Sequence, residues 1–138
     1  MTFSCPIIWV KDRPILTRSH YMWQHEPCFF GWVKGHKPYR LPDAEYLSTV
    51  WTFPTIKPGT ITDHPTSKPV EVFVIPMLQH TRLGEVCYEP FAGSGSQHVA
   101  GEQTGRLVYG LELQPAYVAA ILERLSLMGL GPRLAEGV

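Results

Sequence analysis

The segment at residues 88–97, Tyr-Glu-Pro-Phe-Ala-Gly-Ser-Gly-Ser-Gln, constrains the fold of this chain more than any other. It follows a short apolar run at residues 86–88, which predicts a buried strand. It precedes residues 97–105, which predict a helix that ends at Gly105. A strand, a glycine-containing turn and a helix form the ligand-binding corner of a doubly wound α/β sheet. The segment therefore predicts an α/β fold with a ligand site at this turn.

The residue types in the turn indicate which ligand groups it suits. Gly93 and Gly95 let the backbone approach a ligand and adopt dihedral angles that other residues avoid. Ser94 or Ser96 is expected to cap the helix, and the free N–H groups there suit an anionic group such as a carboxylate. A Gly-x-Gly motif also occurs in turns that bind nothing, so the turn alone leaves that alternative open.

Two flanking segments favour the ligand-binding interpretation. Downstream, residues 107–111 predict a second strand that ends at Glu112, roughly 20 residues after the turn, where an acid commonly binds ribose hydroxyls. Upstream, residues 64–69 read His-Pro-Thr-Ser-Lys-Pro.

Together with the turn, these segments resemble the S-adenosylmethionine-binding half of the DNA amino-methyltransferases, which methylate N6 of adenine or N4 of cytosine. In that family His-Pro-Thr-x-Lys-Pro comes shortly before Asp-Pro-Phe-x-Gly-Ser-Gly, and here Glu89 replaces the usual Asp. The resemblance extends over residues 7–125. It implies a Rossmann-like α/β sheet, S-adenosylmethionine as cofactor and DNA as partner.

The resemblance also implies a role for each cofactor residue. The hydroxyl and ammonium groups of the His-Pro-Thr-Ser-Lys-Pro segment would hold the methionine carboxylate, and Glu112 would accept hydrogen bonds from both ribose hydroxyls. Phe91 would pack near the adenosine or the methionyl chain, and Glu89 would lie near the sulfonium or amino group. The expected cofactor residues are Thr66, Ser67, Lys68, Glu89, Phe91, Gly93, Ser94, Gly95 and Glu112.

One motif of the resembled enzymes is absent. They hold the target amine through an Asp/Asn/Ser-Pro-Pro-aromatic motif, which in the permuted order lies upstream of the cofactor motif. These 138 residues contain no Pro-Pro pair, so no catalytic residue is assigned and no independent catalysis is expected. The missing segment would also supply two central strands, so the sheet is expected to be incomplete. Either the remaining strands close up, or a second chain or copy fills the space, or the edges stay exposed.

The N-terminal part predicts an antiparallel strand pair at residues 6–10 and 27–33. Residues 11–14 are expected to turn the chain, because Pro14 cannot continue a ladder, and residues 18–24 are expected to form a loop. The adjacent His25 and Glu26 are expected to be a structural hydrogen-bonding pair and not a general base.

Three further elements are expected along the chain. Residues 49–53 predict a short strand. Residues 69–81 are β-branched and favour a strand by propensity, but the resemblance implies a helix with Pro69 in its first turn, and we predict the helix. The apolar spacing at residues 117–125 predicts a helix packed on the sheet, beginning near Pro115 and ending at Gly129.

The formal net charge is zero, which does not by itself indicate nucleic-acid binding. Residues 1–69 nevertheless contain eight Lys/Arg and five Asp/Glu, whereas residues 70–138 contain four and seven. A basic N-terminal half fits contacts to DNA phosphates, although a solvated loop explains the same charges. The candidate DNA-contacting residues are Lys34, Lys37, Arg40 and Lys57.

The chain length of 138 residues predicts one methyltransferase-like domain, with a strand pair at residues 1–63 and a cofactor-binding half at residues 64–138. The three cysteines are far apart and show no zinc-binding spacing, so reduced thiols and no metal are expected. No apolar run is long enough for a membrane span and no signal peptide is evident, so a cytoplasmic protein of bacterial, archaeal or viral origin is expected.

Two other functions are alternatives to a methyltransferase-like domain. A non-catalytic cofactor sensor or DNA-binding subunit would retain the same cofactor turn. An NAD-type oxidoreductase fragment is less favoured, because the turn lacks the third glycine of the dinucleotide fingerprint and residues 64–69 are then unexplained.

Overall fold

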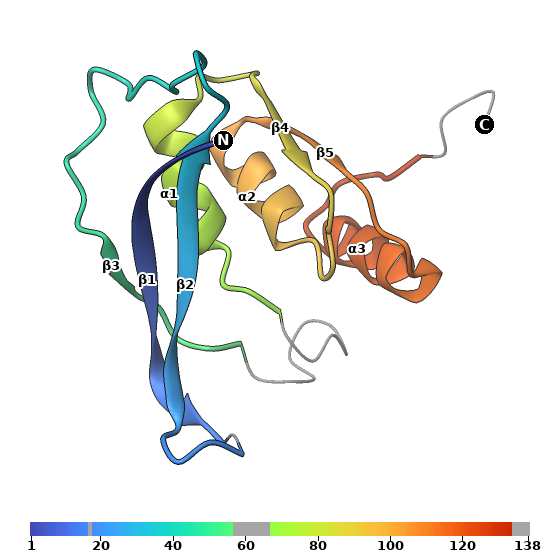
Figure 1. Cartoon of the computed structure of the whole chain (residues 1–138). Coiled ribbons are helices and arrows are strands. Elements are labelled where there is room, and N and C mark those ends of the chain that lie inside the picture. The colour runs from blue at the N-terminus through green and yellow to red at the C-terminus, as the bar shows by residue number, and fades with distance from the viewer. Residues whose placement is uncertain (17, 57–66, 134–138) are drawn as a thin grey trace.

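The computed structural model describes residues 1–16, 18–56 and 67–133, and its elements follow an α/β order. A long strand pair comes first, and strands then alternate with helices (Figure 1). The elements are β1 (Thr2–Ile15), β2 (Trp23–Trp32), β3 (Val50–Thr52), α1 (Glu71–His80), β4 (Val86–Glu89), α2 (Ser96–Thr104), β5 (Leu107–Gly110) and α3 (Pro115–Leu127).

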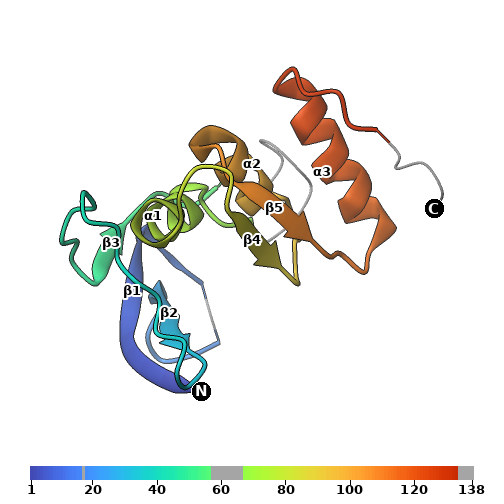
Figure 2. The same ribbon diagram turned by 90° about the horizontal axis from the view of Figure 1, so that it is seen from above.

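The strands form two separate sheets. In the first, the order is β2-β1-β3, with β1 antiparallel to β2 and parallel to β3. In the second, β4 pairs in parallel with β5, and the described residues add no further strand. Figure 1 shows α1 between the β1–β2 hairpin and α2, and Figure 2 shows α3 on the far side of the β4–β5 pair from α1. The predicted antiparallel strand pair and the predicted incomplete α/β sheet are both confirmed.

The first hairpin is longer than expected. β1 continues through Pro14 to Ile15, so the prediction of a turn at residues 11–14 is wrong. The pairing with β2 is irregular between Val10 and Ile15, which allows Pro14 to lie in the strand without donating a ladder hydrogen bond. The loop predicted at residues 18–24 is correspondingly shorter, because β2 already begins at Trp23.

The conflict over residues 69–81 is resolved in favour of the predicted helix. α1 includes Pro76 and buries Met77, whose sulfur lies 3.6 Å from the Thr104 hydroxyl of α2. Packing of α1 on α2 therefore overrides the strand propensity of the β-branched residues.

The core is small for a chain of this size. The accessible surface is 10010 Å², whereas a compact monomer of 15.6 kDa exposes about 7,250 Å². Parallel sheets are normally covered on both faces, but one face of the β4–β5 pair exposes Val86, Tyr88, Leu107 and Tyr109. The described part of the chain thus leaves uncovered much of the surface that such a sheet usually buries. None of the helices within the described ranges is long and apolar enough to cross a membrane.

The last helix lies where expected but contacts a different part of the molecule. Ile121 of α3 packs against Gly95, and Arg124 bonds to the turn between β4 and α2. The exposed face of the β4–β5 pair is therefore not sealed by α3, and the helix instead supports the turn.

Candidate functional site

The turn between β4 and α2 depends on two left-handed glycines. Gly93 has a φ of 53° and Gly95 a φ of 75°, a region that side-chain-bearing residues rarely adopt. A Cβ on Gly95 would also lie 3.0 Å from an Ile121 carbon. Glycine is therefore required at Gly95 by both the backbone conformation and the close approach of α3.

The prediction that a serine caps α2 is wrong. Gly95 occupies the N-cap position, and no side chain makes a capping hydrogen bond. The Ser96 hydroxyl instead donates to the Lys68 carbonyl at 2.7 Å. Because Gly95 is the N-cap residue, the Ser96 side chain does not cap the helix. Its hydrogen bond instead connects the segment before α1 to the start of α2.

A pocket of about 290 Å³ opens at the carboxyl ends of β4 and β5, where open α/β sheets bind ligands. Six of the nine expected cofactor residues line it: Lys68, Glu89, Phe91, Gly93, Ser94 and Glu112. Gly95 is the N-cap residue of α2 and is not in the lining, Ser67 directly precedes Lys68 in the sequence, and Thr66 lies outside the described residues. Sequence reasoning missed Phe73 and Tyr117, which also line the pocket.

Two carboxylates stand at the rim of this pocket. Glu112 accepts from the Gly93 N–H at 2.8 Å through Oε2 and from the Gln114 N–H at 2.9 Å through Oε1. Glu89 accepts from the Phe91 N–H at 2.8 Å. Glu112 therefore links the end of β5 to the glycine turn, and both acids present acceptor oxygens to the space between the strands.

A chain of charges reaches the pocket from the hairpin. Lys68 Nζ lies 3.0 Å from Glu26 Oε2, and Lys11 Nζ lies 2.7 Å from Glu26 Oε1. Burial acts to raise the pKa of Glu26, but hydrogen bonds and charge from the two lysines outweigh it, and the pKa lies below its ordinary value. Lys11 is largely buried, so Glu26 neutralises a charge that has little contact with water.

The expected pairing of His25 with Glu26 is replaced by these lysine contacts. The imidazole of His25 instead stacks on Trp23, with ring centroids 6.5 Å apart and planes 8° from parallel. The Glu26 carboxylate, by contrast, joins β1, β2 and the segment before α1 through Lys11 and Lys68.

A half-buried histidine of α2 lies within the electrostatic range of Glu89. Burial lowers the pKa of His98, although the negative charge of Glu89 opposes the shift. Its Nδ1 is buried without a hydrogen-bond partner in the described part of the chain, and a Cβ on Gly110 would lie 2.4 Å from its Cε1. A proton on this ring would therefore introduce a poorly solvated charge between α2 and β5.

We expect His98 to make folding stability fall with pH below about 6.5, the ordinary histidine value. The folded state has the lower pKa, so in this range the unfolded chain binds more protons and is favoured as pH falls. Urea unfolding between pH 7.5 and 5.5 should show a shallower pH dependence in His98→Asn than in the wild type. The exposed His20→Asn control should retain the wild-type slope; equal slopes in all three proteins would exclude this role.

Two of the candidate DNA-contacting residues, Lys37 and Arg40, lie in a segment away from the pocket. The Lys37 ammonium lies over the Trp32 ring, and the Arg40 guanidinium stacks on Tyr46 with 3.8 Å to the ring centroid and bonds to the Ala44 carbonyl. Between them, Tyr39 contacts Glu85 at the amino end of β4. The segment is thus at the edge opposite the pocket. Lys34 is exposed, and Lys57 lies outside the described residues.

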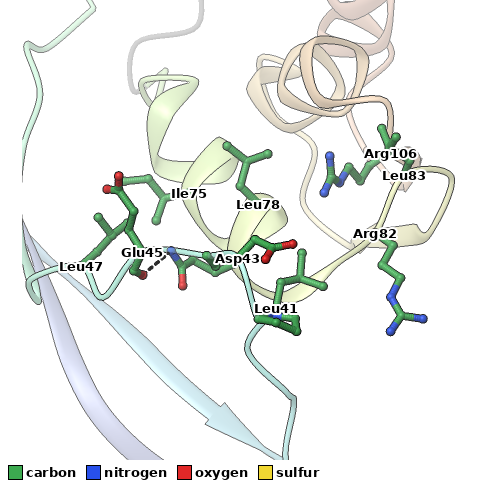
Figure 3. Close-up of a pocket in the computed structure, with 12 residues that line it drawn as sticks. Leu41, Asp43, Glu45, Leu47, Ile75, Leu78, Arg82, Leu83 and Arg106 are labelled. Atoms are coloured by element: carbon green, nitrogen blue, oxygen red, sulfur yellow. Dashed lines mark hydrogen bonds between the residues drawn. The ribbon is translucent and has the colours of Figure 1, made fainter.

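A larger hollow of about 740 Å³ lies on the outer face of α1 (Figure 3). Ile75 and Leu78 of α1 face Leu41 and Leu47 across it, and Arg106 lies at one end. The Arg106 guanidinium is already bonded to Thr81 and Thr104 oxygens. The hollow is broader and more apolar than the pocket at the turn and contains none of the expected cofactor residues, so we regard the smaller pocket as the candidate site. In the described part of the chain, no three His, Cys, Asp or Glu side chains are grouped as metal ligands.

The comparisons with known proteins all indicate the same family. The family model described as a DNA methylase, N6_N4_Mtase, matches residues 2–123. The type II methyltransferase M.Cfr9I of Citrobacter freundii is 32% identical over 120 residues, which are 84% of this chain and 39% of that relative. The type II methyltransferase M2.DpnII of Streptococcus pneumoniae is 27% identical over 138 residues, 86% of this chain and 49% of that relative.

Solved structures share the fold. The M1.HpyAVI–SAM complex matches with a TM-score of 0.73 and 26% identity, over 89% of this chain and 62% of that one. The PvuII DNA methyltransferase, described as cytosine-N4-specific, matches with a TM-score of 0.74 and 14% identity, over 96% of this chain and 51% of that one. The chain spans less than half the length of the two curated relatives above.

Proposed function

Because the chain belongs to the N6/N4 DNA methylase family, we propose that its pocket binds S-adenosylmethionine and that the chain is the cofactor-binding part of a DNA amino-methyltransferase. The main observation behind this proposal is that Lys68, the Gly93 turn and Glu112 all line one pocket. These groups come from three separate segments, and each offers a contact that one part of the ligand requires.

The chemistry of the lining fits the parts of S-adenosylmethionine. The Lys68 ammonium, only partly neutralised by its shared partner Glu26, suits the methionine carboxylate. The two carboxylate oxygens of Glu112 are hydrogen-bond acceptors at the end of β5, which suits a ribose diol. The exposed ring of Phe91 offers a surface for the adenine. Thr66 and Ser67 keep the roles that the family resemblance implies for them.

Methyl transfer to an exocyclic amine requires groups that these residues do not supply. In such a transfer, S-adenosylmethionine would supply the methyl group to the amine nitrogen as the methyl–sulfur bond broke, S-adenosylhomocysteine would leave, and the nitrogen would lose a proton. Acceptors must hold the amine N–H groups during this step, and the flipped base must be stacked. We propose that these groups come from polypeptide beyond these 138 residues, either in the same longer protein or in a second chain or copy.

The space between the two sheets is the proposed place for that polypeptide. Among the described strands, β2 and β4 each have an unpaired edge beside it. A hollow of about 260 Å³ there is lined by Phe30, Phe73, Met77 and Cys87, among others. An unpaired edge beside apolar side chains favours addition of further strands. The exposed face of the β4–β5 pair is consistent with such an addition.

The proposed DNA partner fits the closed end of the β1–β2 hairpin better than the segment at Lys34 to Arg40. Glu26, near that end, contacts Lys68 at the pocket, whereas the other segment lies at the amino edge of β4. Arg13, Arg18 and Tyr21 are exposed there, and the hairpin projects from the body (Figure 1). A two-stranded ribbon is narrow enough to enter the major groove.

Neutralising the two hairpin arginines is therefore expected to weaken DNA binding. Arg13→Gln/Arg18→Gln should reduce the slope of log affinity against log salt concentration by about 2 for a short duplex, because two phosphate contacts are lost. Fluorescence anisotropy across a salt series measures the slope. Lys34→Gln/Lys37→Gln is the matched control and should leave it unchanged. A larger change in the control would place the DNA on the opposite edge.

Calorimetric titration tests the proposed function directly. S-adenosylmethionine and S-adenosylhomocysteine should bind the chain with dissociation constants that are micromolar or lower, and NAD should bind at least about tenfold more weakly. With tritiated S-adenosylmethionine, the chain alone should transfer no methyl group to DNA. Equal binding of NAD would contradict the cofactor assignment, and methyl transfer by the chain alone would contradict the proposed need for further polypeptide.

A further inference from the structure

Arg124 is a buried cation on the far side of the turn from the pocket opening. It lies in α3 with 8% of its surface exposed. Its Nη1 donates to the Ser94 carbonyl at 2.9 Å and to the Ser96 hydroxyl at 3.2 Å. The guanidinium therefore fixes two residues that line the pocket without itself lining it.

The described residues place no carboxylate against this guanidinium. Their ion pairs involve Glu26 with Lys11 and Lys68, and the contacts of Arg124 are with neutral oxygens. Burial lowers the pKa of Arg124, yet an arginine remains charged in proteins. Within the described residues, this largely buried charge contacts the dipoles of a carbonyl and a hydroxyl, and no carboxylate offsets its desolvation.

The contacts of Arg124 continue to the cation of the pocket. The Ser96 hydroxyl that accepts from Arg124 donates to the Lys68 carbonyl at 2.7 Å. Arg124, Ser96 and Lys68 therefore form one connected path from α3, through the first residue of α2, to the segment before α1. The path sets the position of Lys68 relative to the turn.

We propose that Arg124 is a positioning residue for the anionic end of the ligand: it holds Ser94, Ser96 and the Lys68 backbone in place and contributes positive charge behind the turn. This inference rests on the proposed function, because the anionic end is taken to be the carboxylate of the methionyl group. The proposal predicts that the two parts of the ligand respond differently. Binding of the carboxylate depends on Arg124, whereas binding of the adenosine part depends on other residues of the pocket.

Two ligands that differ in the amino-acid part test this distinction. S-adenosylhomocysteine contains the carboxylate, and 5′-methylthioadenosine has the same nucleoside without it. In Arg124→Met, which keeps an unbranched apolar stem, the dissociation constant for S-adenosylhomocysteine should rise roughly 30-fold. The value for 5′-methylthioadenosine should change by less than about twofold. Arg124→Lys retains the charge and should recover most of the loss, and Arg133→Met on the exposed segment after α3 is the control.

A second variant keeps the test decisive if Arg124→Met does not fold. Ser96→Ala removes the hydroxyl between Arg124 and Lys68 without removing a charge, and it should weaken S-adenosylhomocysteine binding roughly fivefold while sparing 5′-methylthioadenosine. Equal losses for both ligands, or no loss for either, would overturn the inference. Failure of the wild-type chain to bind S-adenosylhomocysteine would instead refute the proposed function on which the inference rests.

Discussion

Replacing Gly93 by valine is expected to weaken S-adenosylmethionine binding by about 100-fold. Gly93 has a φ of 53°, which costs a β-branched residue about 1–2 kcal/mol, and its N–H bonds to Glu112 at 2.8 Å. If the turn relaxes to a negative φ, the N–H direction changes and the Glu112 contact is lost, at about 1.5–3 kcal/mol for a bond to a charged group. Calorimetric titration of the folded variant measures the change.

A second glycine provides the control for backbone strain. Gly35 has a φ of 88° with nothing within 4 Å of a Cβ, and it lies in the segment after β2. Gly35→Val should therefore cost similar stability while leaving the affinity for S-adenosylmethionine unchanged. Wild-type affinity in Gly93→Val would show that the turn does not contact the ligand, and equal losses in both variants would show a general effect of strain.

Replacing Glu26 by glutamine is expected to lower the free energy of unfolding by about 2–3 kcal/mol. Lys11 is buried, and its ammonium lies 2.7 Å from Glu26. Removing one partner of such a pair leaves an uncompensated buried charge, which costs about 3–5 kcal/mol when both are fully buried. Because the Glu26 side chain is 34% exposed, we expect less than that range. Urea unfolding at neutral pH measures the loss.

A double variant separates the orphaned charge from lost packing. Lys11→Met/Glu26→Gln removes the lysine that the single variant leaves unpaired, so it should regain at least half of the lost stability. Glu102→Gln on the exposed surface of α2 is the control for a simple change in net charge and should stay within about 0.5 kcal/mol. If Glu26→Gln were as stable as the wild type, the pair would not contribute to folding.

Local patterns in the sequence were sufficient for most elements of the fold. The strand–glycine–helix segment around Gly93, the helix after Pro69 and the antiparallel pair all formed as predicted, because each depends on neighbouring residues or on the family resemblance. The errors were also local. The sequence predicts that Pro14 ends β1, but the irregular pairing of β1 with β2 accommodates this proline. Residue propensities do not show where the hydrogen bonds between two strands are interrupted.

The site was less predictable where it depends on contacts between distant segments. The His-Pro-Thr-Ser-Lys-Pro motif predicts a role for Lys68, but the contact of Lys68 with Glu26 requires the hairpin to lie beside the pocket, which no local pattern encodes. Arg124 and Tyr117 belong to α3, whose apolar spacing predicts only that the helix packs on the rest of the fold. The contact of Arg124 with the turn and the position of Tyr117 in the pocket lining become visible only in the structure, where the turn lies against α3.

The central claim is that S-adenosylmethionine occupies the pocket between Lys68, the Gly93 turn and Glu112. Titrating the ¹⁵N-labelled chain with S-adenosylmethionine and following the backbone amide resonances by NMR tests it most directly. We predict a saturable shift of the Gly93 amide, accompanied by shifts at Lys68 and Glu112. Shifts confined to Leu78 and Leu83 in the hollow on the outer face of α1, or no shifts at saturating ligand, would contradict the claim.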